Sequence, residues 1–243
     1  MEEINKENLP KHIAIILDGN RRWAKARGLT TKEGHTEGFD NLERIAKFCD
    51  EIGIKYLTVY AFSTENWKRS AEEVSWLMNI FKTNVDRYLA KLDNGNIKIR
   101  IIGEKENIPE ELEPRIEKIM DRTKDNKGLT LNIAFNYGGR AELVNVAKII
   151  AERVRNNELK IEDINEQTIS NYVYTAGQPD PDLLIRTSHE LRTSNFLPWQ
   201  LTYTEFYFPE KNWPEFTNED LLEAIKEYQS RNRRFGGRPD VKK

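Results

Sequence analysis

The sequence of 243 residues contains a single cysteine and no large excess of either charge. Cys49 cannot form a disulfide within the chain, which is typical of proteins from a reducing cytosol. It lies in the helical pattern IAKFCDEIG, where we expect a buried bystander and not a nucleophile. Lys and Arg number 38 and Asp and Glu 40, so the net charge is −2 and we expect no nucleic-acid partner. Local arginine clusters must therefore carry any binding of anions.

Long apolar runs are also missing. A helix that crosses a bilayer needs about 20 consecutive apolar residues, and no run approaches that length. The first residues, MEEINKENLPKH, carry acidic charge and lack the apolar core of a signal peptide. We expect a cytoplasmic protein without a transmembrane segment, which can still associate with a membrane-borne molecule.

Several motifs that identify common enzyme families are absent. No GxxxxGK[ST] sequence is present, and no GxGxxG follows a strand pattern, so neither a P-loop nor a dinucleotide fingerprint is found. Ser63 and Ser194 lie in no GxSxG elbow. Three histidines without an HExxH pattern argue against a zinc site. A phosphatase that forms an aspartyl phosphate would need a second carboxylate two residues after Asp18, where the chain has Asn20.

Strand and helix patterns alternate along most of the chain. We expect strands over 12–17, 55–62, 97–103, 129–137, 183–185 and within 203–208. Helices are expected from 21 onward and over 34–53, 71–92, 109–124, 139–155, 165–172 and 218–234. This alternation predicts a single α/β domain, residues 1–243, with a mostly parallel, twisted sheet of about six strands and helices on both faces. Residues 1–9 and 238–243 are expected to be disordered tails.

The stretch HIAIILDGNRRWA passes from an apolar strand directly to a concentrated set of charges. Ligands of open α/β sheets bind at the carboxyl ends of strands, and a following helix offers unpaired N–H groups to an anion. Asp18 is unusual there, because a lone carboxylate repels phosphates unless a hard cation such as Mg2+ lies between them. An Asp after a strand is more often a turn residue or an N-cap, and Trp23 is more often a packing residue. A phosphate site is favoured by the neighbouring Gly19, Asn20, Arg21 and Arg22.

Two further segments place polar and basic groups just after strands. The segment after 55–62 supplies Ser63, Thr64, Glu65, Asn66, Trp67 and Arg69. The segment after 183–185 supplies Arg186, Arg192, Thr193 and Ser194. Two arginines with a hydroxyl suit a diphosphate. Each of these residues could be an ordinary loop residue, but their expected position at one rim of the sheet favours a substrate site.

His35 and Glu205 are candidates of another kind. His35 follows Gly34 near the start of a predicted helix. A histidine there is usually a neutral capping or core residue, and the functional alternative is a donor that faces a phosphate. Glu205 lies in the aromatic run TYTEFYF, where a charge needs a partner or a cation. It is the second candidate for Mg2+.

Seven blocks of this sequence together resemble the cis-prenyltransferases, including the bacterial undecaprenyl diphosphate synthases. They are HIAIILDGNRRWA, the pair Gly34-His35, YAFSTENWKR, LNIAFNYGGR, LIRTSHELRTSNFLPWQ, TEFYFP and RNRRFGG, in order from about Pro10 to Gly237. The resemblance implies a homodimeric, Mg2+-dependent enzyme that adds isopentenyl diphosphate, with cis double bonds, to an allylic primer such as farnesyl diphosphate. The implied product is a long polyprenyl diphosphate such as undecaprenyl diphosphate, a cell-wall precursor that is delivered to the membrane.

The resemblance also implies roles for individual residues. Asp18 matches the Mg2+-linked carboxylate, and Glu205 the second metal-linked acid. The allylic diphosphate would be held by Gly19, Asn20, Arg21, Arg22 and His35, with Trp23 in the same block. The loop that positions the substrates would comprise Ser63, Thr64, Glu65, Asn66, Trp67 and Arg69, with Asn66 as a candidate for a part in proton removal. The isopentenyl diphosphate site would comprise Arg186, Arg192, Thr193 and Ser194.

Two larger elements follow from the same resemblance. Arg234-Phe235-Gly236 matches a terminal element that in the family reaches toward the partner's active site. The hydrocarbon chain needs an apolar tunnel, for which the stripe over 74–92 and the strands at 58–61 and 129–134 are candidates, although most of that stripe is core.

Two departures from the family pattern and one alternative remain. Thr31, next to Lys32, stands where most relatives have an arginine, and Leu191 stands where some have a histidine, with His189 nearby. A trans-type elongase is disfavoured because no DDxxD motif occurs. The alternative to an enzyme is a non-catalytic subunit that pairs with an active cis-prenyltransferase; a generic phosphate-binding hydrolase would have to explain Asp18 without a second acid.

Overall fold

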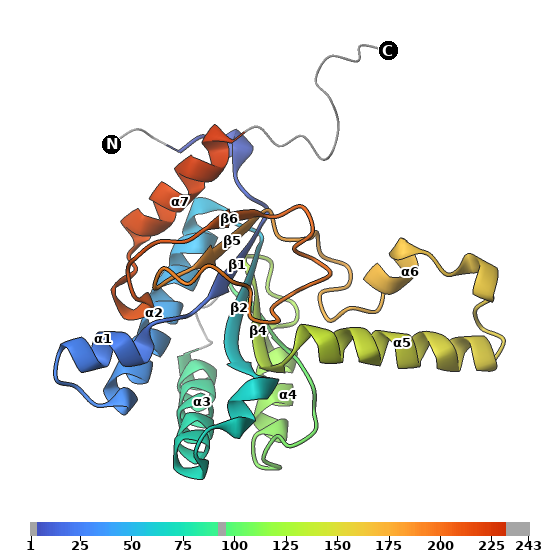
Figure 1. Ribbon diagram of the computed structural model, residues 1–243, viewed down its shortest axis with the longest axis horizontal. Coiled ribbons are helices and arrows are strands. Elements are labelled where there is room, and N and C mark those ends of the chain that lie inside the picture. The colour runs from blue at the N-terminus through green and yellow to red at the C-terminus, as the bar shows by residue number, and fades with distance from the viewer. Residues whose placement is uncertain (1–3, 92–95, 232–243) are drawn as a thin grey trace.

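The computed structural model describes residues 4–91 and 96–231 and contains one six-stranded sheet in which all neighbouring strands run parallel. The strands lie in the order β3-β4-β2-β1-β5-β6 (Figure 1). Their bounds are His12–Ile16 (β1), Tyr56–Ser63 (β2), Lys98–Ile102 (β3), Thr130–Tyr137 (β4), Leu183–Arg186 (β5) and Glu205–Tyr207 (β6). The predicted α/β class with a parallel sheet of six strands is confirmed.

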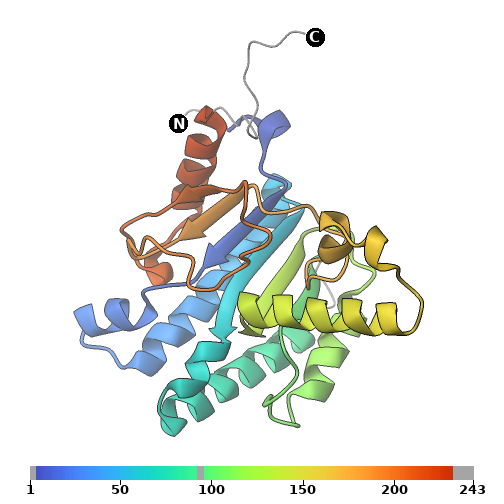
Figure 2. The same cartoon turned by 45° about the vertical axis from the view of Figure 1, so that its right-hand side comes forward.

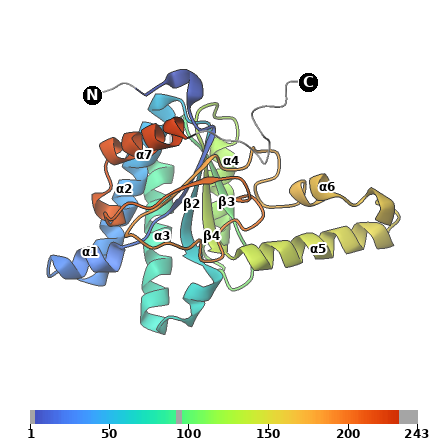
Figure 3. The ribbon, with the colours of Figure 1, turned by 45° about the horizontal axis from the view of Figure 1, so that its top comes forward.

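Helices pack on this sheet mainly from one side. The α-helices are α1 (Asn20–Ala26), α2 (Thr31–Ile52), α3 (Ala71–Lys91), α4 (Glu113–Thr123), α5 (Gly139–Arg155), α6 (Glu166–Ser170) and α7 (Asn218–Ser230). Helices α2, α3, α4 and α7 contribute to the larger hydrophobic core. Figure 3 shows α2, α3 and α7 on one side of the strands and α5 on the other. Tyr174, Phe196, Leu197 and Leu201 cover the other face. Helix α5 starts beside them, where Gly139 lies against Pro198, and the rest of α5 projects away from the sheet together with α6 (Figure 1).

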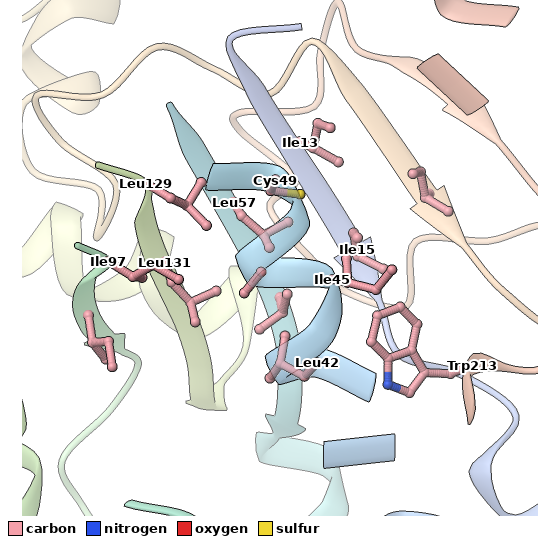
Figure 4. Close-up of a cluster of buried hydrophobic side chains, with 14 of the residues drawn as sticks. Ile13, Ile15, Leu42, Ile45, Cys49, Leu57, Ile97, Leu129, Leu131 and Trp213 are labelled. Atoms are coloured by element: carbon pink, nitrogen blue, oxygen red, sulfur yellow. The ribbon is translucent and has the colours of Figure 1, made fainter. Parts of the chain in front are cut away.

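Strand β1 shows why the sheet is buried on both faces. Successive side chains of a strand point to opposite faces. Ile13 and Ile15 therefore enter the core beneath α2, whereas Ala14 and Ile16 enter the second core on the other face. All five residues of β1 are buried, as expected for a central parallel strand. Figure 4 shows the first of these cores, in which Cys49 is fully buried. Its burial raises the thiol pKa to about 12, so the prediction of a bystander holds.

Helix boundaries differ from the prediction where polar side chains form the end turns. Helix α2 begins at Thr31 and not at Gly34, because Thr30 and Glu33 form a capping box that the apolar pattern does not include. Helix α4 begins only at Glu113. Thr217 and Asp220 form a capping box at the start of α7.

The chain ends fall partly outside the described residues. Of the predicted disordered tails, 1–3 and 238–243 are not described, while Lys6–Asn8 form the short 3-10 helix η1. Gln229 of α7 donates to the carbonyls of Asn5 and Asn8, at 2.7 and 2.9 Å. The element 234–236 and the end of the predicted stripe at Leu92 also lie outside the described residues.

A chain of buried polar side chains crosses the sheet near the amino ends of the strands. His12 on β1 bonds the carbonyl of Pro179 through Nδ1 and Thr58 Oγ1 through Nε2, both at 2.7 Å. Asn132 on β4 donates to Thr58 Oγ1 at 2.9 Å and exchanges hydrogen bonds with Gln178. These contacts join three strands and the 178 loop.

Because the strands are parallel, their carboxyl ends meet at a single rim. Figure 2 shows the arrowheads of β1 and β2 pointing toward the end of the molecule where α1 and the short 3-10 helix η2 (Thr64–Lys68) lie. The segments that follow β1, β2 and β5 start from this rim, which is where ligands of open α/β sheets bind.

Candidate active site

A cavity of about 580 Å3 opens where the segments after β1, β2 and β5 meet. Nine of the predicted site residues line it, namely Asp18, Asn20, His35, Ser63, Glu65, Asn66, Arg69, Arg186 and Ser194. Apolar side chains line it as well, among them Leu17, Phe39, Phe62 and Leu77. The site therefore combines a polar rim with hydrocarbon walls.

Asp18 lies between two arginines. Its Oδ2 accepts a hydrogen bond from Nη2 of Arg186 at 2.8 Å, and its Oδ1 accepts one from Nη2 of Arg22 at 2.9 Å. Its backbone N–H donates to Thr187 Oγ1 at 3.1 Å, and that hydroxyl donates to the Asp18 carbonyl at 2.7 Å. The N-cap of α1 is Gly19, so Asp18 is not a helix cap.

Arg186 anchors the opposite wall. Its side chain is only 5% exposed, and Nη1 donates to Ser194 Oγ at 2.8 Å and to the Arg192 carbonyl at 2.5 Å. Its Nε is buried without a hydrogen-bond partner. A buried guanidinium with an unused donor is suited to an incoming phosphate oxygen.

Glu190 joins the two more exposed arginines of the rim. Its carboxylate accepts from Arg22 at 2.5 Å and also pairs with Arg192. The side chains of Arg22 and Arg192 are 49% and 61% exposed, so both guanidinium groups reach solvent at the rim. An anionic ligand would compete with Glu190 for them.

The loop after β5 is held in an unusual backbone conformation. Five of its residues other than glycine have a positive φ, at Ser188, His189, Ser194, Asn195 and Leu197. Side chains other than glycine adopt this region at a cost, and such residues concentrate at functional sites. The conformation brings Ser194 back over Arg186, while His189 stays exposed and lines no part of the cavity.

Close backbone approaches position the start of α1. Gly19 has φ +103°, and a Cβ there would come within 2.4 Å of Asn212 Oδ1. Gly34 and Gly38 of α2 lie against Asn20. A Cβ at Gly34 would come within 2.4 Å of the Asn20 carbonyl oxygen, and a Cβ at Gly38 would come within 2.3 Å of Asn20 Oδ1. Asn20 Nδ2 donates to the Leu17 carbonyl at 3.1 Å, and Oδ1 is buried without a partner. The glycines thus allow α1 to sit directly against α2 at the cavity.

The segment after β2 forms the 3-10 helix η2 and not an irregular loop. Asn66 Oδ1 accepts from the Ser63 N–H at 3.0 Å, which fixes the amide at the cavity wall. Glu65 Oε1 accepts from Asn195 Nδ2 at 2.9 Å, so this segment is tied to the loop after β5. Arg69 lines the cavity and pairs with Glu73 of α3 at 3.0 Å.

His35 is a neutral member of the site. Burial, with a smaller contribution from Arg69, lowers its pKa to about 4. Its ring meets that of Trp76 edge-on at 5.7 Å, and its Nε2 is buried without a hydrogen-bond partner. At neutral pH the ring therefore lines the cavity without adding charge.

Several predicted residues lie outside the cavity lining. Trp67 donates to Asn136 Oδ1 at 2.6 Å and packs on Phe62, and Trp23 lies under the guanidinium of Arg27 at 4.6 Å. Both indoles therefore pack against protein. The remaining members at the rim, Gly19, Arg21, Arg22, Thr64, Arg192 and Thr193, are not part of the lining either.

Glu205 does not join Asp18 within the chain. It opens β6 in register with Leu183, which is itself in register with Ile13 near the start of β1. Asp18 lies five residues further along, about 16 Å in the strand direction. The Glu205 carboxylate instead accepts from Arg231 at 2.9 Å. The two acids of one chain therefore cannot share one ion.

The donor set at Asp18 fits a cation held jointly with a substrate. Mg2+ commonly takes one or two protein carboxylates and completes its shell with water and substrate phosphates. No group of three or more acidic, histidine or cysteine ligands occurs within residues 4–91 and 96–231, so these residues form no closed protein cage. Asp18 supplies one carboxylate beside basic groups, which fits a metal bound through a diphosphate.

Sequence reasoning did not single out every residue of the site. Tyr60, which lies in the strand segment 58–61 predicted as part of the apolar tunnel, lines the cavity and stacks on Phe196 at 4.6 Å. Phe39, Trp213 and Asn195 were not predicted. Asn195 lines it too and accepts from the Arg140 N–H at 2.9 Å through Oδ1. In the sequence, only its position next to Ser194 indicated that Asn195 belongs to the site. Its hydrogen bond to Arg140 of α5 joins residues far apart in the chain and could not be predicted.

Comparison with known proteins identifies the family of this chain. The family model described as "Putative undecaprenyl diphosphate synthase" matches residues 16–236, which is most of the chain. The chain belongs to the undecaprenyl diphosphate synthase family. Its members transfer prenyl groups, and this chain is accordingly a prenyl transferase. The predicted resemblance is confirmed.

Relatives of known name agree with this family assignment. An isoprenyl transferase of Clostridium perfringens is 49% identical over 96% of this chain and 92% of its own length. That of Bacillus subtilis is 48% identical over 97% of this chain and 91% of its own.

Two solved structures of family members share the fold. Lavandulyl diphosphate synthase from Lavandula x intermedia, in complex with dimethylallyl diphosphate, has a TM-score of 0.91 and 41% identity over 95% of this chain and 99% of its own. A probable undecaprenyl diphosphate synthase from Campylobacter jejuni has a TM-score of 0.77 and 31% identity over 97% of this chain and 100% of its own.

Among the described residues, no helix is long and apolar enough to cross a membrane.

Proposed function

We propose that this protein is a Mg2+-dependent cis-prenyl chain elongase. It would condense isopentenyl diphosphate with an allylic diphosphate such as farnesyl diphosphate and repeat the step to give a long polyprenyl diphosphate such as undecaprenyl diphosphate. The observation that carries the proposal is the cavity itself. Asp18 and a set of arginines stand at the rim of a 580 Å3 space with apolar side chains along its walls. That combination matches a diphosphate attached to a hydrocarbon.

The first step proposed is departure of the allylic diphosphate. The bond from the allylic carbon to oxygen breaks, and the electron pair leaves with the diphosphate. Arg22, the start of α1 and His35 would hold this diphosphate and stabilise the charge that develops on it. Asp18 would hold Mg2+, which would supply further neutralisation of that charge.

The second step proposed is bond formation to isopentenyl diphosphate. Its double bond attacks the allylic carbon, and one proton is lost to create the new cis double bond. Arg186, Arg192 and Ser194 would bind its diphosphate, since the guanidinium of Arg186 is already aligned by Ser194. Asn66, whose amide is fixed at the wall, is the candidate for a part in proton removal.

Assembly and location complete the proposal. We propose a homodimer in the cytoplasm whose product is delivered to the membrane for use in the cell wall. Apolar side chains exposed on and beyond the projecting α5 support a second copy as partner, with Val144 55% and Ile161 72% exposed. The non-catalytic subunit is not retained, because the family is one of prenyl transferases and nine predicted site residues line one cavity.

One assay tests the proposed function. Purified protein is incubated with labelled isopentenyl diphosphate, Mg2+ and either farnesyl or dimethylallyl diphosphate, and the products are sized by mass spectrometry. A ladder of products that differ by five carbons is expected, and it should disappear when EDTA removes the metal. A single condensation product without a ladder, or no product at all, would contradict chain elongation.

A further inference from the structure

A cavity of about 390 Å3 lies at the β3 edge of the sheet, beside the amino ends of the strands. Tyr56, Lys98 and Thr130 line it and are level with one another at the starts of β2, β3 and β4. The 176–178 loop and the end of α4 complete its walls. It shares no lining residue with the active-site cavity, which lies at the carboxyl ends of the strands. The two spaces are therefore separate.

The lining of this edge cavity is basic. Lys98, Arg100 and Lys124 contribute to it, and no Asp or Glu is among its lining residues. Lys124 pairs with Asp121 at 2.7 Å, so part of its charge is already balanced. Within residues 4–91 and 96–231, Lys98 and Arg100 form no ion pair with a carboxylate. The chain as a whole carries a net charge of −2, so this positive cavity is a local feature.

Arg100 is the member of the cavity whose charge is least well solvated. Its side chain is partly buried, and this burial lowers the pKa of the guanidinium. Its Nη2 donates to the carbonyl of Tyr174 at 3.1 Å, which is the hydrogen bond that the described part of the chain provides for it. A partly buried cation that has no carboxylate partner is unfavourable, and an anion in the cavity would offset that cost. The remaining N–H groups of the guanidinium are free to donate to such an anion.

The rest of the lining fits an organic group beside the anion. Ile99, Met120 and the ring of Tyr56 provide apolar surface, and Gln178 provides a hydrogen-bonding amide. That amide is held in place because it exchanges hydrogen bonds with Asn132 at 2.7 and 3.0 Å. Pockets for small molecules measure about 300–1,000 Å3 and combine apolar walls with a few fixed polar groups. The edge cavity has both properties, so it has room for more than an inorganic ion.

We infer that the edge cavity binds the phosphate group of a small phosphomonoester. Arg100 would donate two parallel hydrogen bonds to the phosphate oxygens, and Lys98 would add a second positive charge. The organic part of the ester would lie against Tyr56 and Met120. This binding does not depend on the proposed prenyl transfer, because no residue of the active-site cavity takes part in it. The ester belongs either to a soluble molecule or to the headgroup of a membrane lipid.

Calorimetric titration with phenyl phosphate tests the soluble source. Wild type should bind one more equivalent per chain than Arg100→Gln, since any binding at the active site is common to both proteins. Lys118→Gln is the matched control, because it removes the same charge from an exposed position of α4 outside the cavity. It should bind as many equivalents as wild type. Circular dichroism checks that the variants keep the wild-type fold.

Co-sedimentation with vesicles tests the lipid source. Phosphatidylcholine vesicles are compared with and without phosphatidic acid, whose headgroup is a phosphomonoester. If the ligand is a lipid, phosphatidic acid should retain wild type and Lys118→Gln on the vesicles but not Arg100→Gln. Dependence on Arg100 in either experiment supports the site and identifies its source, whereas no dependence in both would overturn the inference. Should Arg100→Gln not fold, Lys98→Gln replaces it and should weaken the same binding at least about tenfold.

Discussion

Asp18 is the residue on which the proposed chemistry depends most. In Asp18→Asn the neutral amide keeps the size of the side chain but loses the charge that would hold a cation. We expect kcat to fall at least about a hundredfold, which corresponds to roughly 3 kcal/mol of transition-state stabilisation. Steady-state kinetics with farnesyl and isopentenyl diphosphate measure this, and circular dichroism checks the fold.

Glu190→Gln is the control for Asp18→Asn, because Glu190 belongs to the same arginine network. Removing this internal competitor should lower KM for a diphosphate substrate and leave kcat within about threefold. A Glu190→Gln variant with the same loss of kcat as Asp18→Asn would show that the network as a whole, and not the proposed metal-linked acid, is responsible.

Gly19 is a residue whose identity the backbone dictates. In Gly19→Ala the positive φ costs about 1–2 kcal/mol, and the added Cβ also collides with Asn212. Gly28→Ala is the matched control, since Gly28 also has a positive φ but nothing within 4 Å of the added Cβ. Urea denaturation should therefore show a larger loss for Gly19→Ala than for Gly28→Ala, and equal losses would refute the close contact.

At the scale of elements, the amino halves of β1, β2 and β4 are joined by the buried chain that starts at His12. Burial lowers the His12 pKa from 6.5 to about 4. The neutral ring thus stabilises the fold fully above pH 6.5, and this stability is lost as the pH falls from 6.5 toward 4. Between pH 7 and pH 5 we expect a loss of about 2 kcal/mol from this group.

Comparing urea denaturation of wild type and His12→Gln at pH 7 and pH 5 measures that contribution. The variant cannot be protonated at position 12, so its unfolding free energy should fall less between the two pH values. His35, whose pKa is lowered in the same direction, titrates in both proteins and cancels in the comparison. An identical pH dependence in the two proteins would contradict the role of His12.

The order and type of the elements could be predicted from the sequence, because the spacing of apolar residues indicates which side of a helix or strand is buried. The strand pattern at 12–17 and the helical stripe starting at Val74 are examples. Contacts between distant segments were not readable. The stretch STENWKR has the composition of a polar loop, but it forms the 3-10 helix η2, in which the Ser63 N–H donates to Asn66 Oδ1. The positive φ angles of Ser188, His189, Ser194, Asn195 and Leu197 were not predictable either, since none of these five residues is glycine.

For the whole molecule, the placement of Glu205 shows that the sequence does not reveal the register between strands. A strand pattern does not state how far one strand is shifted against the next, so it could not reveal that Glu205 stands level with Ile13 and not with Asp18. The convergence of the segments after β1, β2 and β5 was predictable, because parallel strands place their carboxyl ends on one side. Predicting that the three segments converge requires only that the strands are parallel. Predicting the position of Glu205 requires the register between neighbouring strands as well.

The proposed homodimer belongs to this scale as well. Replacing the exposed Val144 and Ile161 by Glu would place charges on the apolar surface of the projecting α5 and the 3-10 helix η4 (Ile161–Asp163). We expect the double variant to be monomeric at concentrations where wild type is dimeric, as measured by light scattering, with an unchanged circular dichroism spectrum. Glu152→Lys, a charge change on the same helix that adds no charge to an apolar position, is the control. A double variant that stays dimeric would place the interface elsewhere.

The parallel sheet separates two kinds of constraint along its strands. Residues that hold the fold together near the amino ends, such as His12, Thr58 and Asn132, lie at the opposite end from Asp18 and Arg186. Stabilising substitutions made at the amino ends need not disturb the groups that bind diphosphate. A designer could therefore raise the melting temperature at one end of the sheet and alter substrate preference at the other, and treat the two as independent problems.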